Sequence, residues 1–302
     1  MSAATLLNIK IPSEWKGGTI ASFLRVRMGL SRRTIRALKR EAGIRINGEV
    51  APVWRRLTGG EELELRFTPA KQSIIPEEIP LAVIYEDQDL TIIDKPPGML
   101  VHPVKKFQSG TLANALLFRW RAAAESSSFH PVHRLDRLTS GLVLVAKNPW
   151  IHQQLSLQLA SGKMSRLYLA FCKGNLPRNS GKIDAPIKEQ TASALRIIET
   201  GGKPAVTRYR VIAKTEYSTL AAVKLYTGRT HQIRVHLSHL QCPIWGDPLY
   251  GIPERDLPRP ALHAVKLTFE HPRSGKRLIV KSELPADLKK LAVSLGLFSS
   301  LI

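Results

Sequence analysis

The chain has 302 residues, 43% of them hydrophobic, which suffices for one large domain with a substantial core and one small domain. Its 45 Lys and Arg against 24 Asp and Glu give a formal net charge of +21, which predicts a polyanionic partner. Nucleic acid is favoured over an anionic membrane because no long basic amphipathic helix stands out. Only two cysteines, Cys172 and Cys242, argue against a disulfide framework or a cysteine zinc site. Without a signal peptide or a run of about 18 apolar residues, we expect a cytoplasmic protein with no membrane partner.

The first elements predict a small basic domain. Ser31 is a favourable N-cap for a helix over about 32–42, which Gly43 is expected to end. Residues 25–40 include seven basic side chains and no acidic one, which favours phosphate contacts over a merely solvated face. The cations expected to share one face of the helix are Arg32, Arg36, Lys39 and Arg40.

A strand and an Asn-Gly turn are predicted after this helix by "IRINGEV". Two helices with a basic face, then "GIRINGEV" and a Gly-Gly turn, resemble the S-four-like RNA-binding domain over about 14–67. We place this domain at 12–70. The prolines of "TPAKQSIIPEEIP" predict a linker, placed at 71–80, and a second domain at 81–302.

The second domain is rich in short strands, so we expect an α+β fold with a mixed, mainly antiparallel sheet flanked by helices and loops. Hairpins are predicted over 81–95 and 261–284, a buried strand over 141–147, further strands over 166–174, 207–215 and 219–228, and helices over 149–163, 230–240 and 285–296.

The stretch "HRLDRLTSG", residues 133–141, holds one carboxylate between two arginines ahead of a Thr-Ser-Gly turn and an apolar strand. In an extended backbone, Arg134 and Asp136 point to one side and Leu135 points into the core. A carboxylate at such a strand end can face a cleft, and the nearby guanidinium groups favour its ionised form. From these residues alone, Asp136 is either a nucleophile or base, or the acid of a structural Arg–Asp turn.

Other chemistries lack their motifs. The sequence contains no glycine-rich nucleotide loop, no "DFG" to accompany a kinase-like reading of "HRLDR", and no "HExxH". His236 and His239 are neighbours on one helix face, but no carboxylate lies near them in the sequence. We therefore expect neither a metal nor a cofactor.

Four motifs in order resemble the RluA family of pseudouridine synthases over about 81–280. "HRLDRLTSG" is similar to the family's catalytic segment, and "IIDKPPGMLVHP" (92–103) is similar to the motif before it. "SRLYLAFCKG" (165–174) and "LYTGRTHQIRVHLSHLQCPIWGDPLYG" (225–251) resemble the two that follow. One departure is Arg166, where the family often has Lys. The resemblance implies the pseudouridine synthase fold and an isomerase that converts uridines of RNA to pseudouridine.

The resemblance also implies roles for individual residues. Asp136 would be the catalytic carboxylate, acting covalently at the sugar or as a base at the 2′ position. Tyr168 would pack on the uracil, and Arg234 would pair with Asp136, with Arg229 as a weaker candidate for that pairing or for a phosphate. Further RNA contacts are expected from Arg134, which would enter the RNA where the base flips out, and from Lys95 on a phosphate.

Large-subunit ribosomal RNA is the expected target, because an S-four-like domain before this catalytic domain resembles members that modify it. A transfer-RNA-directed synthase remains an alternative, as does a non-catalytic RNA-binding or ribosome-assembly protein that kept the fold. A nucleoside hydrolase is disfavoured, because hydrolysis needs a second carboxylate to handle water. The default oligomeric state is a monomer.

Overall fold

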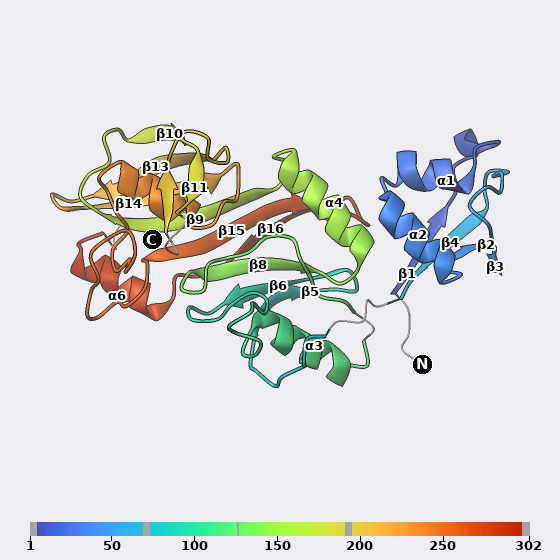
Figure 1. Ribbon diagram of the computed structural model, residues 1–302, viewed down its shortest axis with the longest axis horizontal. Coiled ribbons are helices and arrows are strands. Elements are labelled where there is room, and N and C mark those ends of the chain that lie inside the picture. The colour runs from blue at the N-terminus through green and yellow to red at the C-terminus, as the bar shows by residue number, and fades with distance from the viewer. Residues whose placement is uncertain (1–4, 69–72, 126, 191–194, 298–302) are drawn as a thin grey trace.

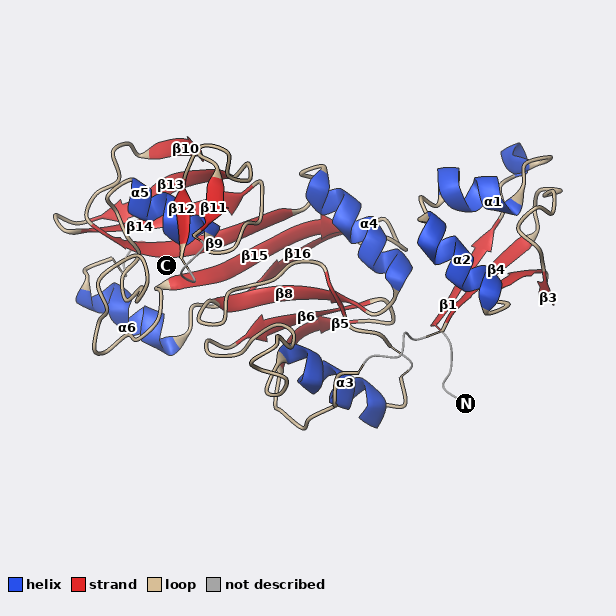
Figure 2. Ribbon diagram, viewed as in Figure 1, coloured by secondary structure: helices blue, strands red, loops and turns tan. Residues whose placement is uncertain are grey.

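The computed structural model describes residues 5–68, 73–125, 127–190 and 195–297, which form a small N-terminal domain and a larger domain built on one long twisted sheet (Figure 1). Strands dominate the larger domain and helices lie along its faces and ends (Figure 2). Most neighbouring strands are antiparallel, so the expected α+β fold with a mixed, mainly antiparallel sheet is confirmed. No helix of the described residues is both long and apolar enough to cross a bilayer.

The N-terminal domain is a four-stranded antiparallel sheet covered by helical turns. Its first strand precedes the expected domain start at residue 12. The strands, in spatial order, are β1 (Thr5–Lys10), β4 (Glu62–Phe67), β2 (Ile44–Ile46) and β3 (Glu49–Val50). The helical segments are a 3-10 turn (Ser13–Trp15), α1 (Ile20–Ser22), a π-helical turn (Phe23–Arg27) and α2 (Arg32–Arg40).

The basic helix α2 begins as the sequence predicts, because the Ser31 hydroxyl accepts a hydrogen bond of 3.1 Å from the Thr34 backbone N–H. Its end differs. Ala42, not Gly43, takes the left-handed conformation, with φ 49°. A Cβ on Gly43 would lie 2.4 Å from the Arg66 carbonyl oxygen, so glycine is required there by close packing against β4. The Asn47-Gly48 turn then joins β2 to β3 with φ values of 50° and 85°.

The large sheet has ten strands, and β15 and β8 are its one parallel pair among the described residues. In spatial order the main path is β10 (Ser180–Asp184), β13 (Val206–Lys214), β14 (Ser218–Leu225), β9 (Ser165–Lys173), β15 (Leu262–Glu270), β8 (Ser140–Ala146), β6 (Leu90–Lys95) and β5 (Ala82–Glu86). Two short strands lie off this path, β16 (Arg277–Lys281) beside β15 and β7 (His130–Pro131) beside β8.

The predicted helices and one additional helix surround this sheet. They are α3 (Leu112–Ala122), α4 (Pro149–Ala160), α5 (Gln232–His239) and α6 (Ala286–Ser294), and a separate two-stranded ribbon pairs β11 (Ile187–Glu189) with β12 (Arg196–Ile198). Helix α3, which the sequence interpretation missed, starts with a capping box between Thr111 and Asn114. Strand β8 is buried along its whole length, as the run "GLVLVA" predicts.

The two domains meet at helix α4, which lies between them in Figure 1. The Gln154 side chain donates 2.8 Å to the Met28 carbonyl, and the Trp150 indole N–H donates to the same oxygen. Gln153 accepts 3.0 Å from the Ser31 backbone N–H and donates to the Gly29 carbonyl. One continuous hydrophobic cluster also includes buried residues of both domains. Part of the expected linker, 71–72, falls outside the described residues.

Candidate active site

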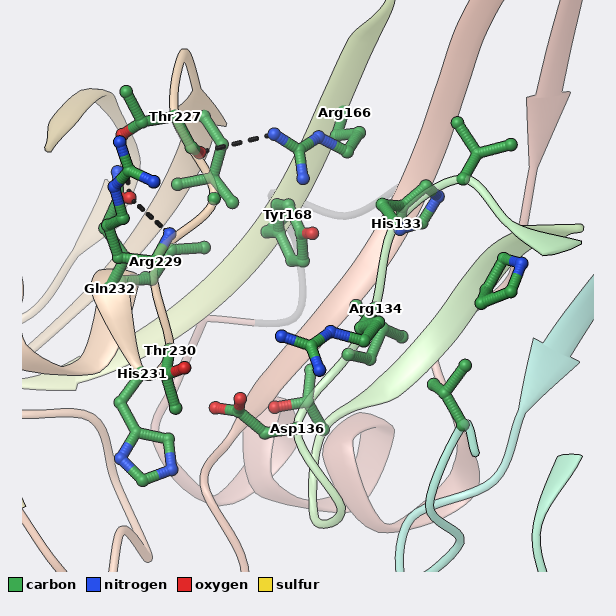
Figure 3. A pocket seen from close by; sticks show the side chains of 18 of the residues that line it. His133, Arg134, Asp136, Arg166, Tyr168, Thr227, Arg229, Thr230, His231 and Gln232 are labelled. Carbon is green, nitrogen blue, oxygen red and sulfur yellow. Dashed lines mark hydrogen bonds between the residues drawn. The ribbon is translucent and has the colours of Figure 1, made fainter. Parts of the chain in front are cut away.

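A cavity of about 860 Å³ opens where the catalytic-segment loop faces α5 and the strands β9 and β14 (Figure 3). Segments far apart in the sequence line it, namely residues 100–102, 104, 131–137, 139, 156, 159–160 and 225–234, together with Arg166, Tyr168 and Leu262. The cavity thus brings together three of the four motifs that the sequence singled out and the end of the remaining one.

Asp136 lies at the entrance to strand β8. The Thr139 backbone N–H donates 3.1 Å to the Asp136 carbonyl, so the tight turn spans 136–139 and not the Thr-Ser-Gly stretch that the sequence suggested. Leu135 is buried, as expected for a residue that points into the core. Gly141, with φ 112°, lets β8 approach β15 so closely that a Cβ would lie 2.4 Å from the Ala264 oxygen. A rigid sheet therefore holds the loop that carries Asp136.

Arg234 on α5 contacts the Asp136 carboxylate, donating 3.3 Å from Nη1. Its other nitrogens, Nε and Nη2, each donate 2.7 Å to the carboxylate of Asp247, which is fully buried. The guanidinium also lies 5.1 Å from the centre of the Tyr250 ring. Burial works to lower the pKa of Arg234, but Asp247 and then Asp136 outweigh it and raise that pKa. One buried cation thus orients two carboxylates, of which Asp136 faces the cavity.

Tyr168 extends from β9 into the middle of the cavity lining, between Arg166 and Asp136 in Figure 3. Its side chain is 3% exposed. Burial raises the pKa of the Tyr168 hydroxyl, with Arg166 acting in the opposite direction and Asp136 in the same one. The hydroxyl is therefore protonated at neutral pH, and the ring offers a flat apolar surface near Asp136.

His231 and Tyr250 contact one another beside Arg234, an arrangement that the sequence did not reveal. His231 precedes α5 in a left-handed conformation, with φ 58°, and lines the cavity. Its Nδ1 lies 2.9 Å from the Tyr250 hydroxyl, which accepts 2.7 Å from the Arg196 backbone N–H. A left-handed backbone in a residue with a side chain stores about 1–3 kcal/mol of strain, and such strain gathers at functional sites.

Comparisons with known proteins decide the family. A model described as RNA pseudouridylate synthase matches residues 89–239. The chain belongs to this family. A second model, the RluD ribosomal pseudouridine synthase N-terminal domain, matches residues 7–63. As an RNA pseudouridine synthase, the chain is an isomerase.

Individual relatives agree with this. A Xanthomonas campestris protein named ribosomal large subunit pseudouridine synthase D is 40% identical over 266 residues, covering 83% of this chain and 80% of its own. An uncharacterized RNA pseudouridine synthase of Bacillus subtilis, YjbO, is 35% identical over 268 residues, covering 87% and 95%. The fold is shared with the solved structure of human RNA pseudouridylate synthase domain containing 4, with a TM-score of 0.59, 24% identity, and coverage of 71% of this chain and 93% of that one.

The structure distributes the predicted RNA-contacting residues of this synthase over two places. Arg134 and Arg229 are exposed and line the cavity. Arg229 donates 3.0 Å to the Pro204 carbonyl, whereas Arg234 is the arginine that contacts Asp136. The cations of the basic face lie on α2, exposed and outside the cavity lining: Arg32, Arg36, Lys39 and Arg40. The basic helix and the cavity are thus separate surfaces.

Lys95 requires a correction, because its side chain is 0% exposed and cannot reach an RNA phosphate. The Lys95 ammonium donates hydrogen bonds to the carbonyls of Pro96, Met99 and Arg137, at 2.8, 2.9 and 3.2 Å. Burial lowers the pKa of Lys95 to about 7, with Asp136 acting in the opposite direction. Lys95 therefore joins the loop after β6 to the turn that carries Asp136.

Metal-ligand side chains gather at one place in the described residues, at Asp87, Asp89 and His271. Arg273 already binds Asp89 with two hydrogen bonds of 2.6 Å, and His271 lies 2.9 Å from Asp87. Their charges are thus compensated by protein groups. His236, which the sequence placed near His239, is buried against Thr207 and the Ala185 carbonyl.

Proposed function

We propose that the synthase isomerises uridines of large-subunit ribosomal RNA and that Asp136 is its catalytic carboxylate. The observation that carries the catalytic assignment is the contact of Asp136 with Arg234 at the wall of a cavity that also contains Tyr168. The RNA target is supported by the match of residues 7–63 to the RluD N-terminal domain and by relatives named ribosomal large subunit pseudouridine synthase D.

The chemistry requires the target base to leave the helix stack, at a cost of a few kcal/mol, before it can enter the cavity. Arg134, exposed at the rim, is placed to occupy the space that the base vacates. Breaking the bond between uracil and ribose leaves positive character on the sugar, as in glycoside hydrolysis. An ionised Asp136 can stabilise that sugar covalently or take its 2′ proton, and Arg234 holds the carboxylate in place for either route.

Isomerisation differs from hydrolysis because the same base is added back through its carbon 5. Tyr168 provides an apolar surface on which the detached uracil remains and rotates before carbon 5 bonds to the ribose. No second carboxylate is among the residues that line the cavity in the described part of the chain, so no group there activates water as in an inverting glycosidase. The arrangement therefore fits isomerisation, in which the same base is returned to the same ribose, better than hydrolysis.

Tritium release tests the catalytic assignment. RNA labelled with tritium at carbon 5 of uridine loses the label when pseudouridine forms, and we expect the wild-type protein to release it and Asp136→Asn to release none. Asp184→Asn, which removes a carboxylate that is 57% exposed and outside the cavity lining, is the matched control and should be fully active. A wild-type protein that binds RNA without releasing tritium would support the non-catalytic alternative.

Mapping pseudouridines in cells with and without the gene tests the target. We expect the sites that disappear with the gene to lie in large-subunit ribosomal RNA. Loss of sites in transfer RNA alone would contradict the proposed target while leaving the catalytic assignment intact.

A further inference from the structure

Arg166 presents an unusual charge at the wall of the active-site cavity. Its side chain is 5% exposed, and no carboxylate of the described residues forms an ion pair with it. Its hydrogen bond to protein is a 3.2 Å contact from Nη2 to the Thr227 carbonyl, while its Nε is buried without a partner in the described structure. Burying a cation without a counter-ion is costly, so an acceptor from outside the chain is expected here.

The fourth motif, residues 225–251, leaves room for this guanidinium. Gly228 lies against it, and a Cβ at that position would come within 3.3 Å of Nη1 and 3.6 Å of Nη2. Arg166 is also the position at which this chain departs from the lysine common in the family. An arginine presents a planar fork of donors that can hold one carbonyl oxygen while it keeps its bond to Thr227.

His133 adds a second unpartnered donor to the same cavity wall. The Leu144 backbone N–H donates 3.4 Å to its Nε2, so the ring proton resides on Nδ1, which is buried and has no partner among the described residues. Burial lowers the pKa of His133 to about 3, and Arg166 acts in the same direction, so the ring is neutral at pH 7. Both residues can therefore donate to a ligand at this wall, and Arg166 cannot accept.

Arg166 lies across Tyr168 from Asp136, and His133 lies to one side of Tyr168 (Figure 3). Asp136 acts at the ribose, which is attached to N1 of uracil, so the opposite edge of the base reaches toward Arg166 when it packs on Tyr168. That edge carries the carbonyl oxygen O4 in uracil and an amino group in cytosine. A wall that offers only donors can hydrogen-bond to the O4 carbonyl of uracil. It leaves the amino group of cytosine without an acceptor.

We infer that Arg166, assisted by His133, recognises the O4 carbonyl of the flipped uracil and thereby rejects cytosine. This rests on the proposed function, because it assumes that Asp136 marks the ribose end of the cavity. It assigns base selection to the place where Arg166 of the third motif meets Thr227 and Gly228 of the fourth.

The test compares two proteins, wild type and Arg166→Gln, on two RNAs that differ in one atom, as in a double-mutant cycle. Two synthetic stem-loop RNAs are compared, identical except that the target position carries uridine or 4-thiouridine, whose sulfur is a weaker acceptor. The wild-type protein should process the thio substrate about tenfold more slowly under single-turnover conditions. Arg166→Gln should be about tenfold or more slower on uridine, with little further loss on 4-thiouridine, because the contact is already gone.

Two further variants define what the loss means. Arg166→Lys restores a cationic donor and should recover most of the rate on uridine. Arg208→Gln removes the same charge from an exposed residue outside the cavity lining and should leave both rates unchanged.

Separate outcomes overturn separate statements. Failure of the wild-type protein to process the uridine RNA contradicts the proposed function. If the wild-type protein processes both RNAs equally fast, O4 recognition is wrong, whether or not Arg166→Gln folds. Equal losses for Arg166→Gln on both RNAs would also overturn it, and would indicate a phosphate contact or a structural role for the guanidinium.

Discussion

Replacing Asp247 by Asn isolates the part played by the second carboxylate of Arg234. The substitution keeps the side-chain volume and one acceptor oxygen, but it removes the charge and the paired hydrogen bonds of 2.7 Å that fix the guanidinium plane. Asp136, now at 3.3 Å, would become the remaining carboxylate in contact with Arg234. The guanidinium is then free to rotate toward it and to displace the Asp136 carboxylate from its place at the cavity wall.

The size of the effect follows from burial. Removing one partner of a buried ion pair costs about 3–5 kcal/mol, and the retained oxygen together with Asp136 places this case near 3 kcal/mol. For a domain of this size, that corresponds to a fall in Tm of roughly 6–12 °C. Displacement of a catalytic group by about 1 Å costs on the order of a hundredfold in rate, so we expect kcat to fall by about that factor with little change in KM.

Thermal unfolding and tritium release measure the two quantities. Asp184→Asn is the control for stability, because its ion pair with Lys182 is about half exposed and should contribute less than about 1 kcal/mol. A double variant of Asp136 and Asp247 should be destabilised by more than the sum of the single variants, since Arg234 would then lose both carboxylates. If Asp247→Asn keeps the wild-type Tm and rate, the orienting role that we give to Arg234 is refuted.

Further predictions concern three other features. The folded protein lowers the pKa of Lys95 from 10.5 to about 7, so between these pH values the unfolded chain binds one more proton than the folded chain. The free energy of unfolding of the wild type, relative to that of Lys95→Met, should therefore increase as the pH rises from 7 toward 10. Denaturant titrations at several pH values check this, and a pH-independent difference would contradict it. Gln153→Ala should loosen the two domains, seen as faster hydrogen exchange at the Ser31 amide, with unchanged exchange in β8. Replacing Arg32, Arg36 and Arg40 of α2 by Gln should weaken RNA affinity and flatten its salt dependence without slowing the chemical step on bound RNA. An unchanged salt slope would refute this prediction.

Local sequence patterns predicted much of this fold because each depends on near neighbours. Ser31 caps its helix through a residue three positions on, and Leu135 alternates with its neighbours to reach the core. Helix α3 was missed although its signal was present, since Thr111 and Asn114 form a capping box with Asn in place of the usual Glu or Gln. Its apolar residues also surround most of the helix, so no clear periodic stripe marks it.

The remaining features depend on groups that no residue pattern displays. The partners of Lys95 are three backbone carbonyls, which every sequence contains, so a lysine beside a Pro-Pro-Gly loop is indistinguishable from one that binds phosphate. Ala42 takes the left-handed position because Gly43 is needed one residue later, against the Arg66 carbonyl of a distant strand. The pairing of Arg234 with Asp136 followed from the family resemblance, whereas the role of Asp247 required the fold.

Helix α4 lies between the basic helix α2 and the active-site cavity, the two places proposed to contact RNA. Near its beginning, Gln153 holds the residue that caps the basic helix, and at its far end Leu159 and Ala160 line the active-site cavity. Its 12 residues span about 18 Å, a length that side-chain packing and backbone hydrogen bonds make stiff. An RNA held at both places must therefore present its phosphate-rich element and its target uridine at a set separation. Site selection would then depend on the shape of the folded RNA as well as on the identity of the flipped base.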